Sequence, residues 1–138
     1  MEMLLAVATI ALLAALSVPF YRSFQVSTQS DVVVFEIAQS MHRAKLKAMA
    51  AENDDSWSVA IGDDSKITLF KGTIYASRDQ QYDETYDLPP TITIAEGNKL
   101  TTFSKFSATP NQSGTISVTD SNGKTKNIII NTRGTVDY

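Results

Sequence analysis

Several residue types are scarce in this chain of 138 residues, which contains no cysteine, one histidine and one tryptophan. The absence of cysteine excludes disulfides, thiolate metal sites and a cysteine nucleophile. An excess of basic residues is also absent, because 12 lysines and arginines stand against 15 acidic residues and give a formal charge of −3. This balance argues against a whole chain built to bind nucleic acid. The length and the 43% of hydrophobic residues predict one folded domain.

The sequence also lacks the motifs by which common enzyme classes are recognised. It has no glycine-rich phosphate loop, no Gly-x-Ser-x-Gly and no His-Glu-x-x-His. The single histidine, His42, lies six residues after Glu36 and three before Lys45, which is not the spacing of a ligand pair or a catalytic pair. We therefore expect a protein that is not an enzyme, with His42 on the surface or in packing.

The apolar residues are concentrated at the N-terminus. No charged side chain lies between Met3 and Tyr21, and all 12 basic residues lie at Arg22 or later. As a helix these 19 residues would span roughly 28 Å, close to the hydrocarbon core of a bilayer. The pattern predicts a transmembrane and assembly helix over residues 1–25, followed by a soluble part over residues 26–138.

A cleaved signal peptide is the main alternative for this segment, since Ala14, Ala15 and Ser17 are small residues near its end. However, a secretory signal has a basic start, and the only charge before the apolar run is Glu2. We therefore favour a retained membrane anchor. Pro19 removes a backbone donor inside the helix, which predicts a kink or local melting there.

The soluble part changes from helical to strand periodicity. An amphipathic helix is predicted over residues 26–52, because apolar residues recur every three or four positions. Short strands separated by turn residues follow over residues 57–138. The predicted strands are Trp57 to Ile61, Lys66 to Phe70, Thr73 to Ser77, Thr91 to Ala95, Leu100 to Phe106, Thr115 to Thr119, Lys126 to Asn131 and Thr135 to Tyr138, with a polar loop from Arg78 to Pro90. One long helix before many strands predicts an α+β fold, with an antiparallel sheet packed on the helix.

The N-terminus resembles that of type IV pilins and type II secretion pseudopilins. In that family a glutamate opens the transmembrane helix and a proline lies seventeen residues later, which is the spacing from Glu2 to Pro19. The family has three more residues before the glutamate, beginning with an N-methylated phenylalanine after a short basic leader. The resemblance therefore implies that such residues precede Met1.

A second resemblance, to the pseudopilin subfamily called GspH/FimT, lies in the C-terminal half. A Phe-Ser element is followed by proline and glycine, although Ala108 or Thr109 stands where this element usually has a further glycine. An Ile-Asn-x-x-Gly-x-Val element lies near the end. The matching residues are Phe106, Ser107, Pro110, Gly114, Ile130, Asn131, Gly134 and Val136.

These resemblances imply a pilin-like fold and a structural subunit of a type IV pilus or a type II secretion pseudopilus. The subunit would polymerise through its apolar helix, with Glu2 neutralising the N-terminal amine of an adjacent subunit. Its implied partners are other pilin or pseudopilin subunits, a prepilin peptidase and the assembly machinery. The implied location is the inner membrane, single-pass with an extracytoplasmic head, before assembly into an extracellular or periplasmic filament. A competence system, and a major or a minor subunit, fit the residues equally.

Two other functions stay open. One is a minor tip pilin that binds DNA or a surface, and the other is a secreted domain with a cleaved signal peptide. For DNA, the candidate residues are the basic side chains of the amphipathic helix, Arg43, Lys45 and Lys47, although helical spacing points them in different directions.

One acidic loop is a candidate for calcium, the only cofactor that the sequence suggests. Calcium takes six to eight oxygen ligands, and extracellular modules bind it through such loops. The spacing is not that of an EF-hand, so the alternative is a solvated loop held by its tyrosines. The four candidate carboxylates are those of Asp79, Asp83, Glu84 and Asp87.

Overall fold

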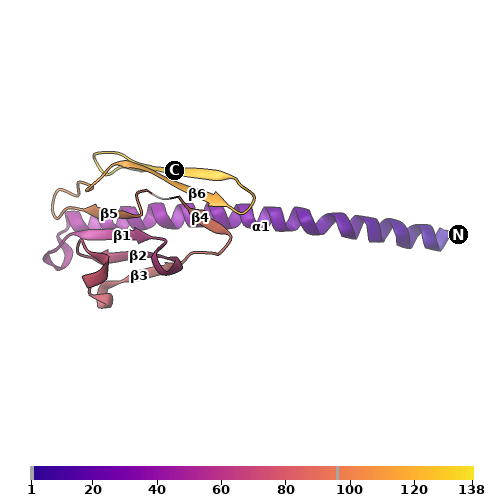
Figure 1. Ribbon diagram of the computed structural model, residues 1–138, viewed down its shortest axis with the longest axis horizontal. Coiled ribbons are helices and arrows are strands. Elements are labelled where there is room, and N and C mark those ends of the chain that lie inside the picture. The colour runs from indigo at the N-terminus through magenta and orange to yellow at the C-terminus, as the bar shows by residue number, and fades with distance from the viewer. Residues whose placement is uncertain (1, 96) are drawn as a thin grey trace.

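A computed structural model describes residues 2–95 and 97–138, apart from the side chains of residues 16–20 and 63. One helix, α1 (Glu2–Met49), dominates the molecule with 48 residues. Its N-terminal half projects away from the strands, and its C-terminal half packs along them (Figure 1). The fold is therefore a rod that carries a head at one end.

The helix is continuous through residue 19, where the sequence predicts a kink or local melting. The helix is thus not interrupted there in the single chain, and the Pro19 side chain itself lies outside the described residues. At its other end α1 stops at Met49, and Ala51 has a left-handed backbone with φ of 49°. The left-handed residue turns the chain back toward the first strand.

Two four-stranded antiparallel sheets form the head, where the sequence predicts a single sheet. The first sheet has the order β3-β2-β1-β5 and the second has the order β4-β6-β7-β8. The first contains β1 (Trp57–Ile61), β2 (Lys66–Lys71), β3 (Glu84–Asp87) and β5 (Leu100–Phe103). The second contains β4 (Ile92–Ile94), β6 (Gly114–Asp120), β7 (Thr125–Ile130) and β8 (Val136–Asp137).

Short 3-10 helices occupy the connections of the first sheet. They are η1 (Glu52–Asp54), η2 (Asp63–Ser65), η3 (Tyr75–Ser77) and η4 (Gln80–Tyr82). The strand predicted over Thr73 to Ser77 is therefore wrong, and so is the loop predicted where β3 lies. β3 pairs with β2 through the register Lys66↔Asp87 to Leu69↔Glu84. The other seven strand predictions are confirmed to within a few residues.

The core lies where α1 meets both sheets. The predicted apolar face of the helix is confirmed, because Val33, Ile37, Met41, Ala44 and Ala48 are all buried. They join one apolar cluster with residues of both sheets, including Trp57 and Ile67 of the first and Val118 and Ile128 of the second. The helix therefore holds the two sheets together.

The predictions about a membrane need correction. Crossing a bilayer takes about 20 consecutive apolar residues as a helix. Among the described residues, no helical stretch combines the length and the apolarity that such a crossing requires. This finding overturns the predicted membrane-spanning first half of the helix, the transmembrane anchor over residues 1–25 and the single-pass location in the inner membrane. The predicted fold class is thus wrong on the membrane span and on the single sheet, while its α+β composition holds.

Candidate functional site

The N-terminal half of α1 carries a long uncovered apolar surface. Every residue from Glu2 to Ala15 is exposed, and Met3 keeps 84% of its surface open. Thr9 is the one polar residue from Met3 to Ala15, and its hydroxyl donates to the carbonyl of Ala6 at 2.8 Å, so the helix satisfies this group internally. The remaining surface is leucine, isoleucine, valine, alanine and methionine. Such a surface favours contact with another apolar surface over contact with water.

Glu2 is the first residue of α1 and its only acidic residue in the first turn. The carboxylate therefore lies at the positive end of the helix dipole, which stabilises a negative charge. It is exposed at the tip of the projecting rod, more than 40 residues along the helix from the end that meets η1. An exposed tip leaves Glu2 accessible to a cation on another chain.

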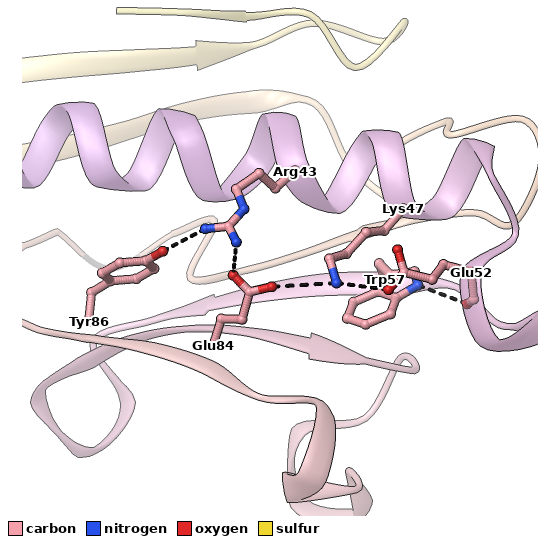
Figure 2. Close-up of polar contacts among 6 residues, drawn as sticks. All are labelled: Arg43, Lys47, Glu52, Trp57, Glu84 and Tyr86. Carbon is pink, nitrogen blue, oxygen red and sulfur yellow. Dashed lines mark hydrogen bonds and ion pairs between the residues drawn. The ribbon is translucent and has the colours of Figure 1, made fainter.

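The predicted basic and acidic candidates meet in one network between α1 and the edge strand β3 (Figure 2). The guanidinium of Arg43 forms an ion pair with Glu84 and donates to the hydroxyl of Tyr86 at 2.7 Å. The ammonium of Lys47 lies 3.4 Å from the other carboxylate oxygen of Glu84. Glu84 thus pairs with two basic side chains, Arg43 and Lys47, which lie one helical turn apart on α1.

Lys47 extends the network to the end of the helix. Its ammonium lies 3.0 Å from a carboxylate oxygen of Glu52 and 4.1 Å from the centroid of the Trp57 ring. The indole of Trp57 donates to the backbone carbonyl of Glu52 at 3.1 Å. Figure 2 shows the chain of contacts running from Tyr86 to Trp57 along the underside of α1. Its role is to fasten β3 and η1 to the helix.

Lys45 points toward the second sheet instead. Its ammonium donates to the backbone carbonyls of Arg133 at 3.2 Å and Gly134 at 3.0 Å. The structure therefore does not bring together the three basic residues that the sequence nominates for DNA. Arg43 and Lys47 meet at Glu84, whereas Lys45 lies on the side of the second sheet.

The four carboxylates predicted to bind calcium are also held apart. Asp83 pairs with Arg78 at 2.7 Å, an interaction that raises the pKa of the arginine, and Asp79 accepts a hydrogen bond from the backbone of Gln81. Glu84 belongs to the network on α1, and Asp87 is exposed on β3. Within residues 2–95 and 97–138, no three carboxylate or imidazole side chains converge as metal ligands would. Ion pairs and a turn therefore hold three of these four carboxylates in separate places.

Two of the residues that resemble the GspH/FimT elements, Pro110 and Gly134, lie close together at the edge of β5. Pro110 forms a β-bridge with Phe103, which covers the outer edge of β5. Gly134 has φ of +70°, and a Cβ added there would lie 3.0 Å from the carbonyl oxygen of Ala108. A glycine is therefore required where the last turn passes over the segment before β6. These positions have a structural role in closing the head.

Glu36 is a polar residue that sequence reasoning left unassigned. It is half-buried on α1 in a groove of about 190 Å³, which Thr28, Val32, Asp87 and others line. Burial raises the pKa of its carboxylate above the usual value. The described residues offer it no hydrogen bond or ion pair. A cation brought near this carboxyl group would stabilise its charged form.

Comparison with known proteins adds no relative to this description. No family model, no curated protein and no solved structure matches the chain.

Proposed function

We propose that this chain is a structural subunit of a filament, of the kind that type IV pili and type II secretion pseudopili form. It polymerises through the apolar N-terminal half of α1. The observation that carries the proposal is the projecting rod, in which every residue from Glu2 to Ala15 is exposed although nearly all are apolar. The resemblance of the Glu2 to Pro19 spacing to pilins and pseudopilins supports the same role.

Assembly of such rods removes apolar area from water. Burying one leucine or valine side chain contributes about 1.5–3 kcal/mol. Leu4, Leu5, Val7, Leu12 and Leu13 are all exposed on the rod. A bundle of such rods buries them at once, and helices of adjacent subunits supply surfaces of the same kind. The heads then lie outside the bundle, because their own cores are already closed.

In this arrangement Glu2 fixes the axial offset between the helices of adjacent subunits. A carboxylate buried among apolar helices is costly alone and tolerated when a cation pairs with it. By the resemblance to pilins, that cation is the N-terminal amine of the adjacent subunit. The pair forms only at one axial offset between two helices, so the charge selects that offset. A prepilin peptidase and assembly machinery remain partners predicted from the resemblance.

The test is to count filaments by electron microscopy on cells that produce the chain. We expect Glu2→Val to reduce assembled filaments strongly, because the amine of the neighbouring subunit would be buried unpaired. Leu12→Lys should abolish assembly, since it places a charge in the apolar bundle. Lys124→Glu, at an exposed turn of the head, is the matched control. Unchanged filament numbers in Glu2→Val and Leu12→Lys would contradict the proposal.

The contacts of the basic residues do not favour DNA binding as a second function. Arg43 and Lys47 pair with Glu84, and Lys45 donates to the carbonyls of Arg133 and Gly134, so the three do not form one basic surface. The secreted domain with a cleaved signal peptide stays a prediction, which mass spectrometry of the mature N-terminus tests. Cleavage after Ala15 or Ser17 would remove the rod and defeat the filament proposal.

A further inference from the structure

The C-terminal half of α1 has an outward face that no other described element covers. Seven of its exposed positions form a row with separations of four, three, four, three, four and three residues, a mean of 3.5. We name this row the outward seam, and its members are Thr28, Val32, Phe35, Gln39, His42, Leu46 and Met49. A repeat of 3.5 residues is the period at which one helix packs along another in a coiled coil.

The seam is rich in large apolar side chains. Val32 is 49% exposed, Phe35 52%, Leu46 64% and Met49 52%. The ring of Tyr138 lies against Phe35 with centroids 6.4 Å apart, which widens the patch toward the second sheet. Single exposed apolar residues are ordinary, whereas a regular row of them indicates a contact surface for protein.

Charge along the seam is arranged by sign. Asp31 and Glu36 flank its N-terminal end, and Arg43 and Lys45 flank its C-terminal end. Within the chain Asp31 pairs with Lys126 and Lys45 donates to two backbone carbonyls, so the charges that bear on a second copy are Glu36 and the partly exposed Arg43. Helical geometry places Glu36 and Arg43 on one flank, toward the first sheet, and Asp31 and Lys45 on the other, toward the second. A parallel pair of seams in register would place like charges opposite one another. An antiparallel pair centred on Gln39 would instead bring Glu36 of one copy beside Arg43 of the other on the same flank.

We propose that the outward seam binds the same seam of a second copy of this chain, antiparallel, with Gln39 facing Gln39 across a two-fold axis. Phe35 of each copy then lies near His42 of the other, and Val32 lies near Leu46. Polar residues at the centre of an apolar seam fix its register and orientation. Gln39 and His42 supply those residues here.

The state of Glu36 agrees with this pairing. Its carboxylate is half-buried without a described partner, and the Arg43 side chain stays 39% exposed despite its contacts with Glu84 and Tyr86. A second copy brings an arginine to each Glu36. The dimer does not rest on the filament, because antiparallel seams point the two apolar rods in opposite directions and leave both uncovered.

Disulfide trapping tests the inference cleanly, because the chain has no cysteine of its own. The full chain is kept in detergent, which covers the apolar rods, and is oxidised with copper phenanthroline. Gln39→Cys is expected to give a covalent dimer on a non-reducing gel. Thr28→Cys and Met49→Cys should cross-link with each other when mixed, and neither should dimerise alone. Asn122→Cys, exposed at the turn between β6 and β7, is the control for random collision.

A second variant separates the seam from general stickiness. Phe35→Ser added to Gln39→Cys should lower the dimer yield roughly tenfold. Its fold is checked by circular dichroism, since Phe35 is exposed and lies outside the core. Dimer yield for Gln39→Cys no higher than for Asn122→Cys would overturn the proposal. Dimers of Thr28→Cys alone would also overturn it, because they require parallel helices. Filament counts of Phe35→Ser are read separately and bear only on the filament.

Discussion

Asp120 shows how a single buried carboxylate shapes the hairpin between β6 and β7. It is only 4% exposed, and one of its oxygens accepts hydrogen bonds from the backbone N–H groups of Asn122 and Lys124, both at 2.9 Å. Its own backbone N–H donates to the carbonyl of Lys124 at 3.0 Å. The side chain therefore satisfies the donors of a turn that ends at Gly123, whose φ is +81°.

Replacement of this carboxylate should destabilise the head measurably. Asp120→Ala leaves two backbone donors of the turn without their acceptor, and we expect the free energy of unfolding to fall by about 1–3 kcal/mol. Asp120→Asn keeps one acceptor oxygen and should lose less. Urea unfolding of the two variants measures the difference. Equal stability of wild type and Asp120→Ala would show that the turn forms without the side chain.

Residue types alone could predict this turn but not the pairing of the charged residues. Asp120 to Gly123 is a strong local turn sequence, since each member has an intrinsic reason to be there. Glu84 and Arg43, by contrast, are 41 positions apart, and nothing local relates them. The sequence therefore predicts Glu84 as a calcium ligand and Arg43 and Lys47 as DNA contacts, whereas the fold pairs these three residues with one another.

At the scale of the element, α1 has two faces with opposite energetic roles. Ile37 is fully buried between the sheets, whereas Phe35, two residues earlier, is 52% exposed. Ile37→Ala should lower the free energy of unfolding by about 2–5 kcal/mol, because it removes buried methyl groups and leaves a cavity. Phe35→Ala should change it by about 0.5 kcal/mol or less, as surface substitutions usually do.

Thermal and urea unfolding of the two variants check this contrast. The two side chains are of similar apolarity, so burial alone distinguishes them. Comparable losses in both would mean that the outward face is covered within the single chain. A loss in Phe35→Ala that grows with protein concentration would instead indicate association through the outward seam, since stability from a bound copy depends on concentration.

The strand β3 explains one error of prediction at this scale. Its sequence, Glu84-Thr85-Tyr86-Asp87, has no strongly apolar residue other than the tyrosine and follows two short 3-10 turns. This polar edge strand is stabilised by backbone pairing with β2 and by the ion pairs of Glu84 with Arg43 and Lys47 on the helix. Neither contribution requires alternating apolar residues in the strand itself. Prediction from the local sequence pattern therefore assigns a loop there.

For the whole molecule, the rod and the head should be energetically separate. No described side chain between Glu2 and Ala15 is buried, and the apolar core begins at Val33. We expect the fragment Val26 to Tyr138 to unfold cooperatively, with a free energy within about 0.5 kcal/mol of the full chain in detergent. Its urea unfolding, with the m-value as a check on exposed area, is the measurement. A large loss would show that the rod stabilises the head.

Elements whose signals are local can be predicted from the residues alone. The apolar N-terminus, the buried helical face from Val33 to Ala48, the strand β1 and the turn at Asp120 each follow from residues close together in the chain. Local periodicity and turn chemistry act within about one or two turns of backbone, so they can be read before any tertiary contact is known.

The pairing of those elements, and what covers each of them, became visible only in the folded chain. It joins β1 to β5 through the register Trp57↔Phe103, splits the strands into two sheets and leaves the outward seam open. It also overturned the membrane span, and it gave the charged candidates their partners. The physical reason is that pairing between distant segments depends on packing over the whole head, which no short stretch of sequence encodes.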